Sequence, residues 1–205
     1  TLHLCQNFRA PVYGMNRGTV GFMMNAYETD ALPLRLSNAE EQLINPLIMK
    51  ATLVDGKVET ALAINEVSLL RAGPQAAKLQ IWVDNRQRMD ELVCDGVLVA
   101  TPAGSTAYNY SAHGPILPMG ADVLAMTALN AYRPRRWRGA LLPKTAVVRI
   151  DVLDTTKRPV MADADSISFK NVKKVEISSD TTVQHRILFN QGHGLDERLI
   201  QEQFV

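Results

Sequence analysis

The chain has few of the features that would assign it to a specialised class of protein. Its 205 residues include only two cysteines, Cys5 and Cys94, which are too few and too far apart for a disulfide framework or a zinc site. The 22 basic and 21 acidic residues give a net charge of +1, so no excess of positive charge favours nucleic acid or an anionic membrane as a partner. The four histidines show no metal-ligand spacing, and no metal site made of protein side chains is expected.

Long hydrophobic runs are also missing. No stretch of about eighteen consecutive apolar residues occurs, so a membrane span is not expected. The first residues, TLHLCQNFRAP, lack the basic segment and apolar run of a secretory signal. With 46% hydrophobic and 21% charged residues, the composition is ordinary for a globular protein. We expect a cytoplasmic protein whose two thiols are reduced and buried.

From Pro46 onward the chain has the pattern of an antiparallel β-sandwich. Residues 47–54 and 58–64 are rich in strand-forming residues and flank Asp55-Gly56, a strong signal for a hairpin turn. Further strands are predicted over residues 79–83, 97–100, 146–153, 172–178 and 182–189. Short strands separated by closely spaced turn signals are typical of such sandwiches.

The beginning of the chain has a different pattern. Apolar residues at helical spacing predict a helix over residues 2–8, and Pro11 ends it before a short strand at 12–15. This helix-to-strand unit indicates the end of an α/β domain whose earlier strands lie outside the sequence. We therefore expect three parts: the remnant of that domain, the sandwich, and a tail that packs back on the N-terminal domain. Their expected ranges are 1–30, 31–190 and 191–205.

Three further segments have a helical pattern of varying strength. Residues 36–44 are expected to be a short helical or irregular segment. Residues 122–132, DVLAMTALNAY, predict a helix with Asp122 as its N-cap. A weaker pattern predicts a closing helix over 195–204.

The densest group of small and polar residues is TPAGSTAYNYSAHGP, residues 101–115. It lacks the Gly-x-Ser-x-Gly elbow of serine hydrolases, because Ala107 stands where the second glycine belongs, and no Gly-Lys-Ser/Thr follows. His113 has no clear triad partner, which disfavours hydrolysis. What remains is a glycine-rich turn opening a short helix near Ser105 or Thr106. Such a turn presents backbone N–H groups and hydroxyls to a polar ligand, with tyrosines as a stacking surface.

Three other motifs leave alternatives open. Asn65-Glu66 ends a strand, where it is either an amide and an acceptor for vicinal hydroxyls or, more commonly on composition alone, a solvated strand end. Asp95-Gly96 lies inside an apolar run and is either a turn or a paired carboxylate. The basic segment 133–138, RPRRWR, is suited to phosphate, but a solvated loop or a subunit contact explains it equally well.

Taken together, these motifs resemble those of the NAD kinase family. The segment DELVCDGVLVATPAGSTAYNYSAHGPI resembles the family signature D-G-x-x-x-x-T-P-x-G-S-T-A-Y-x-x-S-x-G-G-P. Asn65-Glu66 matches an Asn-Glu pair of the family, GMNRGTVGFMMN is similar to its glycine-rich segment, and MADADSISF fits as well. The resemblance covers essentially the whole chain. It implies an α+β, mainly β fold, with a C-terminal antiparallel β-sandwich and the remnant of an N-terminal Rossmann-like α/β domain.

The resemblance also implies a function and a set of partners. NAD kinases are phosphotransferases of NADP biosynthesis, which transfer a phosphoryl group from ATP or polyphosphate to the 2′-hydroxyl of the adenosine ribose of NAD. The phosphate donor comes with a divalent metal ion, which is expected to be Mg²⁺. Family members are homo-oligomers, so a dimer or tetramer is expected, with neither nucleic acid nor membrane as a partner.

Site roles follow from the resemblance residue by residue. Asn65 and Glu66 would hold the adenosine ribose or the adjacent part of the dinucleotide, and Phe22 would pack beside the nucleotide. Asp95 would bind the nicotinamide end from across a subunit interface. The other NAD-binding residues implied lie in the 101–115 segment: Ala103, which would contact the dinucleotide, Thr106, Ala107, Tyr108 and Ser111, which would line the adenine pocket, and Asn109 and Tyr110 beside them.

The sequence departs from the family pattern in three places. The Gly-Gly-Asp-Gly motif with the catalytic aspartate is missing, so no catalytic residue is assigned in this chain and the aspartate is expected upstream of Thr1. Ala103 stands where threonine is usual, and His113 where glycine is usual. Two other functions stay open at this point: a non-catalytic dinucleotide-binding protein, and a related lipid kinase of the diacylglycerol kinase type.

Overall fold

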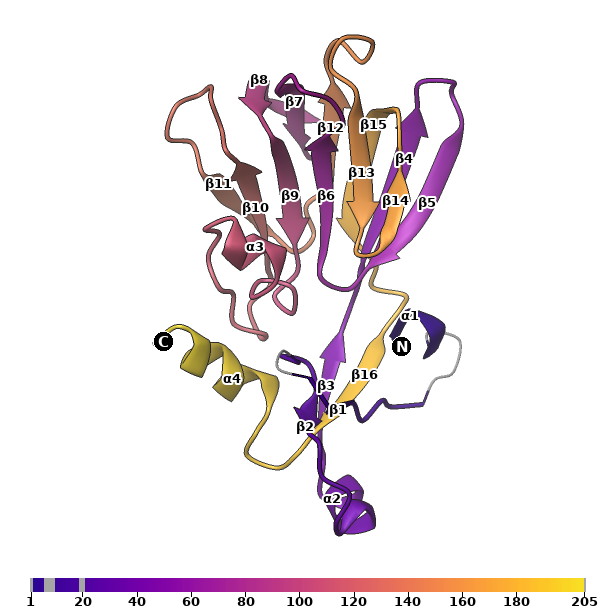
Figure 1. Cartoon of the computed structure of the whole chain (residues 1–205), viewed down its shortest axis with the longest axis vertical. Helices are drawn as coiled ribbons and strands as arrows, with labels where there is room; N and C mark the ends of the chain where they lie inside the picture. Colours follow the sequence, from indigo (N-terminus) through magenta and orange to yellow (C-terminus); the bar gives the residue numbers. More distant parts are fainter. Residues whose placement is uncertain (1, 6–9, 19–20, 205) are drawn as a thin grey trace. The chain divides into compact units, whose positions relative to one another are not determined.

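The computed structural model describes residues 2–5, 10–18 and 21–204 and consists of two compact units (Figure 1). The larger unit is Pro46–Asp180, and the smaller unit combines Thr1–Asn45 with Thr181–Val205. The boundaries therefore fall at residues 46 and 180, where the sequence pattern had placed them at 31 and 190. The reason is that a strand from residues 40–44 pairs with one from residues 185–189, so both belong to the smaller unit.

The larger unit is a sandwich of two six-stranded sheets, as the sequence pattern predicted. All neighbouring strands in both sheets run antiparallel. In spatial order, the first sheet consists of β11 (Gly139–Pro143), β10 (Val123–Leu129), β9 (Gly96–Ala100), β6 (Glu66–Arg71), β13 (Val160–Ala164) and β14 (Ile167–Phe169). The second consists of β5 (Val58–Ala63), β4 (Leu47–Leu53), β15 (Val172–Ser179), β12 (Val148–Val152), β7 (Ala77–Val83) and β8 (Arg86–Cys94).

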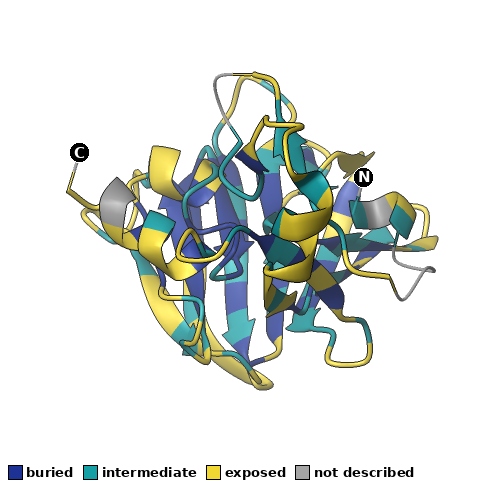
Figure 2. Ribbon diagram, turned by 90° about the horizontal axis from the view of Figure 1, so that it is seen from below, coloured by how far each residue is buried: buried dark blue, intermediate teal, exposed yellow. Residues whose placement is uncertain are grey.

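The core lies between these two sheets and follows the two-residue period of the strands. Along β7 buried and half-buried residues alternate, and the buried set includes Leu79 and Ile81. The first sheet contributes Val67 and Leu69 of β6 to the same cluster. Figure 2 shows these buried residues in dark blue along the strands, with exposed residues in yellow in the loops and helices. This apolar layer holds the edges of the strands, and the loops that follow them, in fixed positions.

The Asp55-Gly56 turn joins β4 to β5 as predicted. Gly56 has φ +89°, a left-handed conformation that glycine adopts without strain, and Lys57 N donates to the Asp55 carboxylate at 2.9 Å. The other strands predicted after Pro46 also form, with ends that differ from the expected ranges by a few residues.

The helix predicted over residues 122–132 is wrong, because this segment forms strand β10. Its Leu124 and Met126 belong to the core between the sheets, while Thr127 and Leu129 are buried on the other face. β10 is therefore covered on both faces and pairs with β9 and β11 on either side. A run of buried Ala, Leu and Met residues favours a helix locally, but pairing on both edges overrides that preference.

The smaller unit contains short elements around two small sheets. These elements are α1 (Leu2–Cys5), β1 (Met15–Asn16), β2 (Asn25–Ala26), α2 (Leu32–Ser37), β3 (Glu40–Ile44), β16 (His185–Phe189) and α4 (Leu195–Glu202). β1 pairs with β2 in parallel, and β3 pairs with β16 antiparallel. The strand expected at 12–15 is reduced to an isolated bridge between Val12 and Ile187, followed by β1.

Two helix predictions at the ends of the chain agree with the structure as far as it is described. α1 lies within the predicted helix over residues 2–8, of which residues 6–8 lie outside the described part. The closing helix forms as α4. The segment 36–44 is corrected: its first two residues end α2, and residues 40–44 form β3 rather than a helical or irregular stretch.

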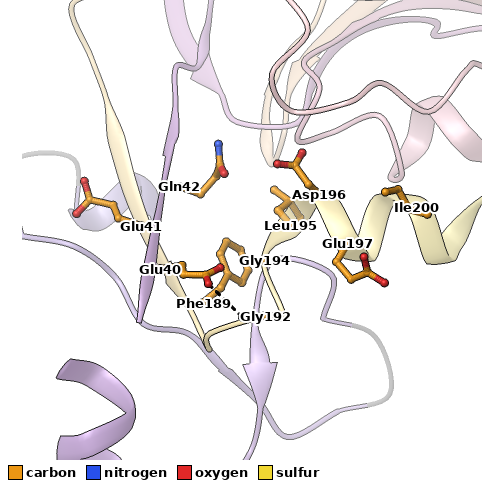
Figure 3. A pocket seen from close by; sticks show the side chains of 10 residues that line it. All are labelled: Glu40, Glu41, Gln42, Phe189, Gly192, Gly194, Leu195, Asp196, Glu197 and Ile200. Atoms are coloured by element: carbon orange, nitrogen blue, oxygen red, sulfur yellow. Dashed lines mark hydrogen bonds between the residues drawn. The ribbon is translucent and has the colours of Figure 1, made fainter. Parts of the chain in front are cut away.

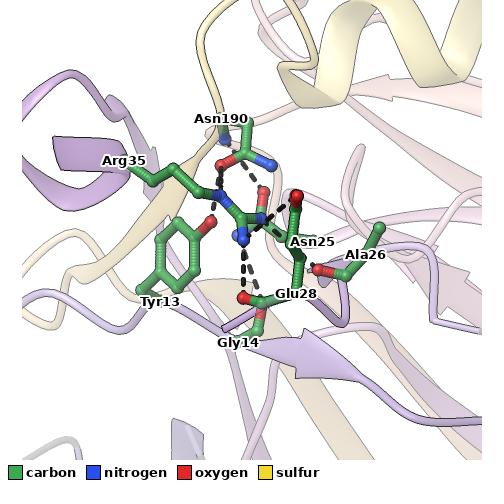
Figure 4. A network of polar contacts seen from close by, with 7 residues as sticks. All are labelled: Tyr13, Gly14, Asn25, Ala26, Glu28, Arg35 and Asn190. Atoms are coloured by element: carbon green, nitrogen blue, oxygen red, sulfur yellow. Dashed lines mark hydrogen bonds and ion pairs between the residues drawn. The ribbon is translucent and has the colours of Figure 1, made fainter. Parts of the chain in front are cut away.

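Buried amide groups hold the segments of the smaller unit together (Figure 4). Asn25 is 1% exposed; its Nδ2 donates to Gly14 O at 3.1 Å and Leu188 O at 2.9 Å, and its Oδ1 accepts from Asn190 N at 2.9 Å. Arg35 donates to the Glu28 carbonyl at 2.6 Å from the other side of this network. A single side chain thus links residues more than 160 positions apart in sequence.

Among the described residues, no helix is long and apolar enough to cross a membrane.

Candidate nucleotide-binding site

The 101–115 segment follows β9 directly and covers the outer face of the first sheet. Helix α3 (Tyr108–Ser111) forms within it. Below the segment, Leu98, Ala100 and Leu129 form a small apolar cluster to which Ala112 adds from above. This cluster is separate from the core between the sheets, so the segment is packed down on its own apolar support.

Thr101 joins this segment to the Asn65-Glu66 turn. Its side chain is 2% exposed, and its Oγ1 donates to Ile64 O at 2.7 Å and accepts from Gly104 N at 3.0 Å. The backbone N of Thr101 donates to Asn65 O at 2.9 Å. Two motifs that lie 36 residues apart in sequence therefore form one continuous hydrogen-bonded surface.

Gly104 makes the contact between the two motifs close enough for these bonds. A Cβ at this position would lie 2.2 Å from Asn65 O and 2.4 Å from Asn65 Cα. No side chain fits at these distances, and the obstructing atoms are backbone atoms that cannot rotate away. The glycine is thus required by the approach of two loops rather than by its own φ.

Asp165 fixes the Asn65-Glu66 turn from the opposite side. It follows β13 with φ 49°, and its carboxylate accepts three backbone N–H groups: Ile64 at 2.7 Å, Asn65 at 3.0 Å and Glu66 at 3.3 Å. A carboxylate with several such partners is a strong and well-oriented anchor. Asp165 lies in the segment MADADSISF, but the sequence alone indicates no role for it. Its only local signal is an Asp-Ser turn between two strands.

Ser105 and Asn109 stabilise the segment internally. Both side chains are fully buried. Ser105 Oγ donates to Pro102 O at 2.7 Å and accepts from Leu117 N at 3.0 Å, so it is not available as a nucleophile. Asn109 Nδ2 donates to Ser105 O and Pro115 O, and its Oδ1 accepts from Thr127 Oγ1 at 2.6 Å.

The side chains left at the surface of the segment are mainly those of α3 and the turn before it. Tyr108 is 38% and Tyr110 43% exposed, Ser111 is exposed, and Thr106 and Ala107 are half-buried. Of the residues predicted to contact the nucleotide, these five are the accessible ones in this segment. Ala103, by contrast, is buried, and Asn109 serves the interior of the loop.

Glu66 is the most perturbed carboxyl group of the site. Burial, and then the charge of Asp165, raise its pKa to about 7, against a smaller opposing effect of a backbone hydrogen bond from Tyr108. Its Oε2 is buried with no hydrogen-bond partner. The pKa of the Tyr108 hydroxyl is also raised, by burial first and then by the charges of Glu66, Asp163 and Asp95. The surface beside Tyr108 is therefore anionic.

Asp95 precedes β9, whereas the 101–115 segment follows it. The two are separated by a five-residue strand, about 17 Å at the usual rise of about 3.3 Å per residue. Asn130 Nδ2 donates to one carboxylate oxygen at 2.9 Å and Arg71 Nε to the other at 2.6 Å. These two hydrogen bonds, Asn130 first, lower the pKa of Asp95. Of the two readings left open by the sequence, the paired carboxylate is correct.

Phe22 belongs to the smaller unit, where its backbone O accepts from Arg198 Nη1 of α4 at 3.0 Å. This unit also contains a cavity of about 430 Å³ (Figure 3). It is lined by Glu40, Glu41, Gln42, Phe189, Gly192, Gly194, Leu195, Asp196, Glu197 and Ile200. Four of these residues are acidic, so the cavity is unsuited to phosphate groups.

Comparison with known proteins decides the family. A family described as the ATP-NAD kinase C-terminal domain matches residues 64–184. An NAD kinase of Cereibacter sphaeroides is 67% identical over all 205 residues, which span 81% of its length. An NAD kinase of Rhizobium meliloti is 53% identical over 204 residues, or 79% of its length. The chain belongs to the NAD kinase family.

Solved structures of NAD kinases share the fold. Yeast NADH kinase, solved with NADH, superposes with a TM-score of 0.82 at 23% identity, over 95% of this chain and 58% of the yeast chain. An NAD kinase of Archaeoglobus fulgidus, solved with ATP, gives a TM-score of 0.78 at 21% identity, over 98% of this chain and 77% of its own. The sequence relatives and the family match, rather than the shared fold, assign this NAD kinase chain to a phosphotransferase that makes NADP from NAD, and the lipid kinase alternative is set aside.

A metal ion has no preformed set of ligands in the described part of this NAD kinase chain. No group of three or more His, Cys, Asp or Glu residues stands close enough together there to hold one.

Proposed function

We propose that the Asn65-Glu66 turn and the exposed face of residues 101–111 bind the adenosine half of NAD. The observation that carries this proposal is the joining of the two motifs by Thr101 and Gly104 into one surface. A rigid surface of this kind holds a ribose in one orientation, and phosphoryl transfer depends chiefly on such positioning.

The charges of the site support the ribose as the group held here. Carboxylates accept hydrogen bonds from vicinal hydroxyls but repel phosphates. Glu66 has a buried oxygen without a partner, which a ribose hydroxyl would satisfy. The accessible ring of Tyr108 offers a stacking surface for adenine, and Thr106, Ala107, Tyr110 and Ser111 complete the exposed face.

Two of the predicted residues have buried side chains, and for these we propose no side-chain contact with NAD. Asn109 is proposed to position the loop rather than to touch NAD, because its donor and acceptor atoms are used within the segment. Ala103 is proposed to contribute through backbone atoms only, since it is 3% exposed. The contact of Phe22 with the nucleotide stays a prediction.

Asp95 is proposed to bind the nicotinamide end of a dinucleotide held by a second copy of the chain. Its position before β9, at the end of the strand away from Thr101, supports a role other than holding the adenosine ribose, although its charge also acts on the Tyr108 hydroxyl. Hydrogen bonds from Arg71 and Asn130 keep its carboxylate ionised and fix its orientation. This role requires a homo-oligomer, either a dimer or a tetramer.

We propose NAD or NADH as acceptor and ATP or polyphosphate as donor, in the cytoplasm. Support comes from the relatives, since yeast NADH kinase was solved with NADH and the Archaeoglobus fulgidus enzyme with ATP. A divalent cation such as Mg²⁺ is proposed to arrive with the phosphate donor, since Mg²⁺ is commonly held by substrate phosphates together with one or two carboxylates. The catalytic aspartate is proposed to lie outside this sequence.

Steady-state kinetics of NADP formation test the proposal in the intact protein. Asn65→Ala and Tyr108→Ala are expected to raise KM for NAD at least tenfold, since each removes a group that contacts the nucleoside. Tyr132→Ala is the matched control, because this tyrosine is 58% exposed and lies outside the proposed site. Unchanged kinetic constants for both site variants would refute the assignment.

A further inference from the structure

The turn that carries Asn65 and Glu66 depends on a residue from a distant strand. Asp165 lies beyond the end of β13 and receives the N–H groups of residues 64, 65 and 66 on its two carboxylate oxygens. In return, Asp165 N donates to Glu66 O at 3.2 Å, so the turns are bound to each other in both directions. No other side chain in the described residues makes three hydrogen bonds to this turn.

The same carboxylate places a negative charge beside Glu66. The two residues lie opposite each other, one step beyond the pairing of Val67 with Ala164. On the other side, Glu66 pairs with Ala100 of β9, which carries no charge. Tyr108 faces Glu66 from α3, and Asp163 and Asp95 act on Tyr108. Asp165 is the charged group that raises the pKa of Glu66, and the charges that act on the neighbouring Tyr108 are also carboxylates.

We propose that Asp165 is a positioning residue of the nucleotide site, which orients the Asn65-Glu66 turn and makes nucleotide binding by Glu66 dependent on pH. This inference rests on the proposed function, because it takes the ribose of NAD as the group that Glu66 binds. Ribose hydroxyls donate to a carboxylate, so the ionised form of Glu66 is the binding form. Three backbone amide donors hold the carboxylate of Asp165 in place.

The proposal predicts how affinity changes with pH. In the free protein Glu66 titrates near pH 7, because burial and the neighbouring Asp165 disfavour its charge. Below that pH most molecules carry a protonated Glu66, and NAD must displace its proton. The dissociation constant is therefore expected to be about tenfold higher at pH 6 than at pH 8, with proton release on binding.

Asp165→Asn changes both the hydrogen bonds of this residue to the 64–66 turn and the negative charge that it places beside Glu66. The amide keeps the size of the side chain but loses the charge, and its NH₂ group faces one of the three N–H donors. We expect weaker NAD binding at every pH and a midpoint of the pH profile that moves to lower pH. Asp163→Asn is the matched control: it removes an equal charge two residues away, and its carboxylate is not among the groups that shift the pKa of Glu66.

Isothermal titration calorimetry of the intact protein with NAD, from pH 5.5 to 8.5, tests the proposal. The proposal is supported if the midpoint of the dependence of NAD affinity on pH shifts to lower pH in Asp165→Asn and is unchanged in Asp163→Asn. A uniform loss of affinity with an unchanged midpoint overturns it, because a merely structural residue behaves in that way. A wild-type affinity that is constant between pH 6 and 8 also overturns it, even if the variant fails to fold.

A second measurement separates this inference from the proposed function. Carbon-13 NMR of the Glu66 carboxyl in the ligand-free protein follows its titration without any nucleotide. A lower midpoint in Asp165→Asn supports the coupling of the two residues, and an unchanged midpoint refutes it, whatever the protein binds. Failure of NAD to bind the wild-type protein would instead contradict the proposed function, while the NMR result still decides the role of Asp165 on Glu66.

Discussion

Replacing Gly104 with alanine perturbs the contact on which the whole site depends. The added Cβ would lie 2.2 Å from Asn65 O and 2.4 Å from the carbonyl carbon and Cα of Asn65. Because these are backbone atoms, relief requires the 101–115 segment and the 64–66 turn to separate. Separation by about 1 Å would break the hydrogen bonds from Thr101 N to Asn65 O, at 2.9 Å, and from Thr101 Oγ1 to Ile64 O, at 2.7 Å.

The size of the effect follows from these losses. Two hydrogen bonds contribute about 0.5–1.5 kcal/mol each, and overpacking costs about 1–3 kcal/mol. Gly104→Ala is therefore expected to lower the free energy of unfolding by about 2–6 kcal/mol. If the 101–115 segment separates from the turn while the protein stays folded, the same free energy appears as weaker NAD binding, by a factor of about 30 or more.

Urea unfolding followed by circular dichroism, together with KM for NAD, measures both outcomes in the intact protein. Gly120→Ala is the matched control, since a Cβ at Gly120 meets no atom within 4 Å. Its stability is expected to stay within about 0.5 kcal/mol of wild type. Stability and KM of Gly104→Ala equal to those of the control would refute the account of how the two motifs are joined.

Three further substitutions probe single residues. Ser105→Ala removes two buried hydrogen bonds and is expected to cost about 1–3 kcal/mol in urea unfolding, with kcat within a few-fold of wild type; loss of turnover in a folded variant would show a chemical role. His113→Gly relieves a side chain at φ 62° and is expected to raise stability by about 0–1 kcal/mol, so a clear loss would contradict it. The raised folded-state pKa of Glu66, about 7, means that wild-type stability falls as pH rises from 4.5 to 7. Glu66→Gln is thus expected to be more stable than wild type by about 1–3 kcal/mol at pH 8 and equal to it at pH 4, measured by urea unfolding at both pH values, and an equal difference at the two would exclude titration as the cause.

Features encoded by neighbouring residues were predictable from the sequence. The hairpin at Asp55-Gly56 and the strands around it depend on local turn chemistry and on a two-residue hydrophobic period. The 101–115 segment was recognisable from its density of glycine, hydroxyl and aromatic residues. The missing serine-hydrolase elbow was also visible in the sequence, and in the structure the hydroxyl of Ser105 is buried.

Features set by contacts between distant residues were not predictable. β10 was predicted as a helix because its residues favour one locally, and only its pairing with β9 and β11 makes it a strand. Asp165 was missed because its role exists only once β13 lies beside β6, about 100 residues away in sequence. The sequence likewise gave no sign that Asn109 would turn inward to Thr127 while the neighbouring tyrosines stay exposed.

The central claim is that the Asn65-Glu66 turn and the 101–115 segment form one binding surface for the adenosine half of NAD. Hydrogen–deuterium exchange of the intact protein, measured with and without saturating NAD, tests it most directly. The account predicts slower exchange on NAD binding in both residues 64–66 and residues 101–111. Unchanged exchange in both segments under saturating NAD would contradict it.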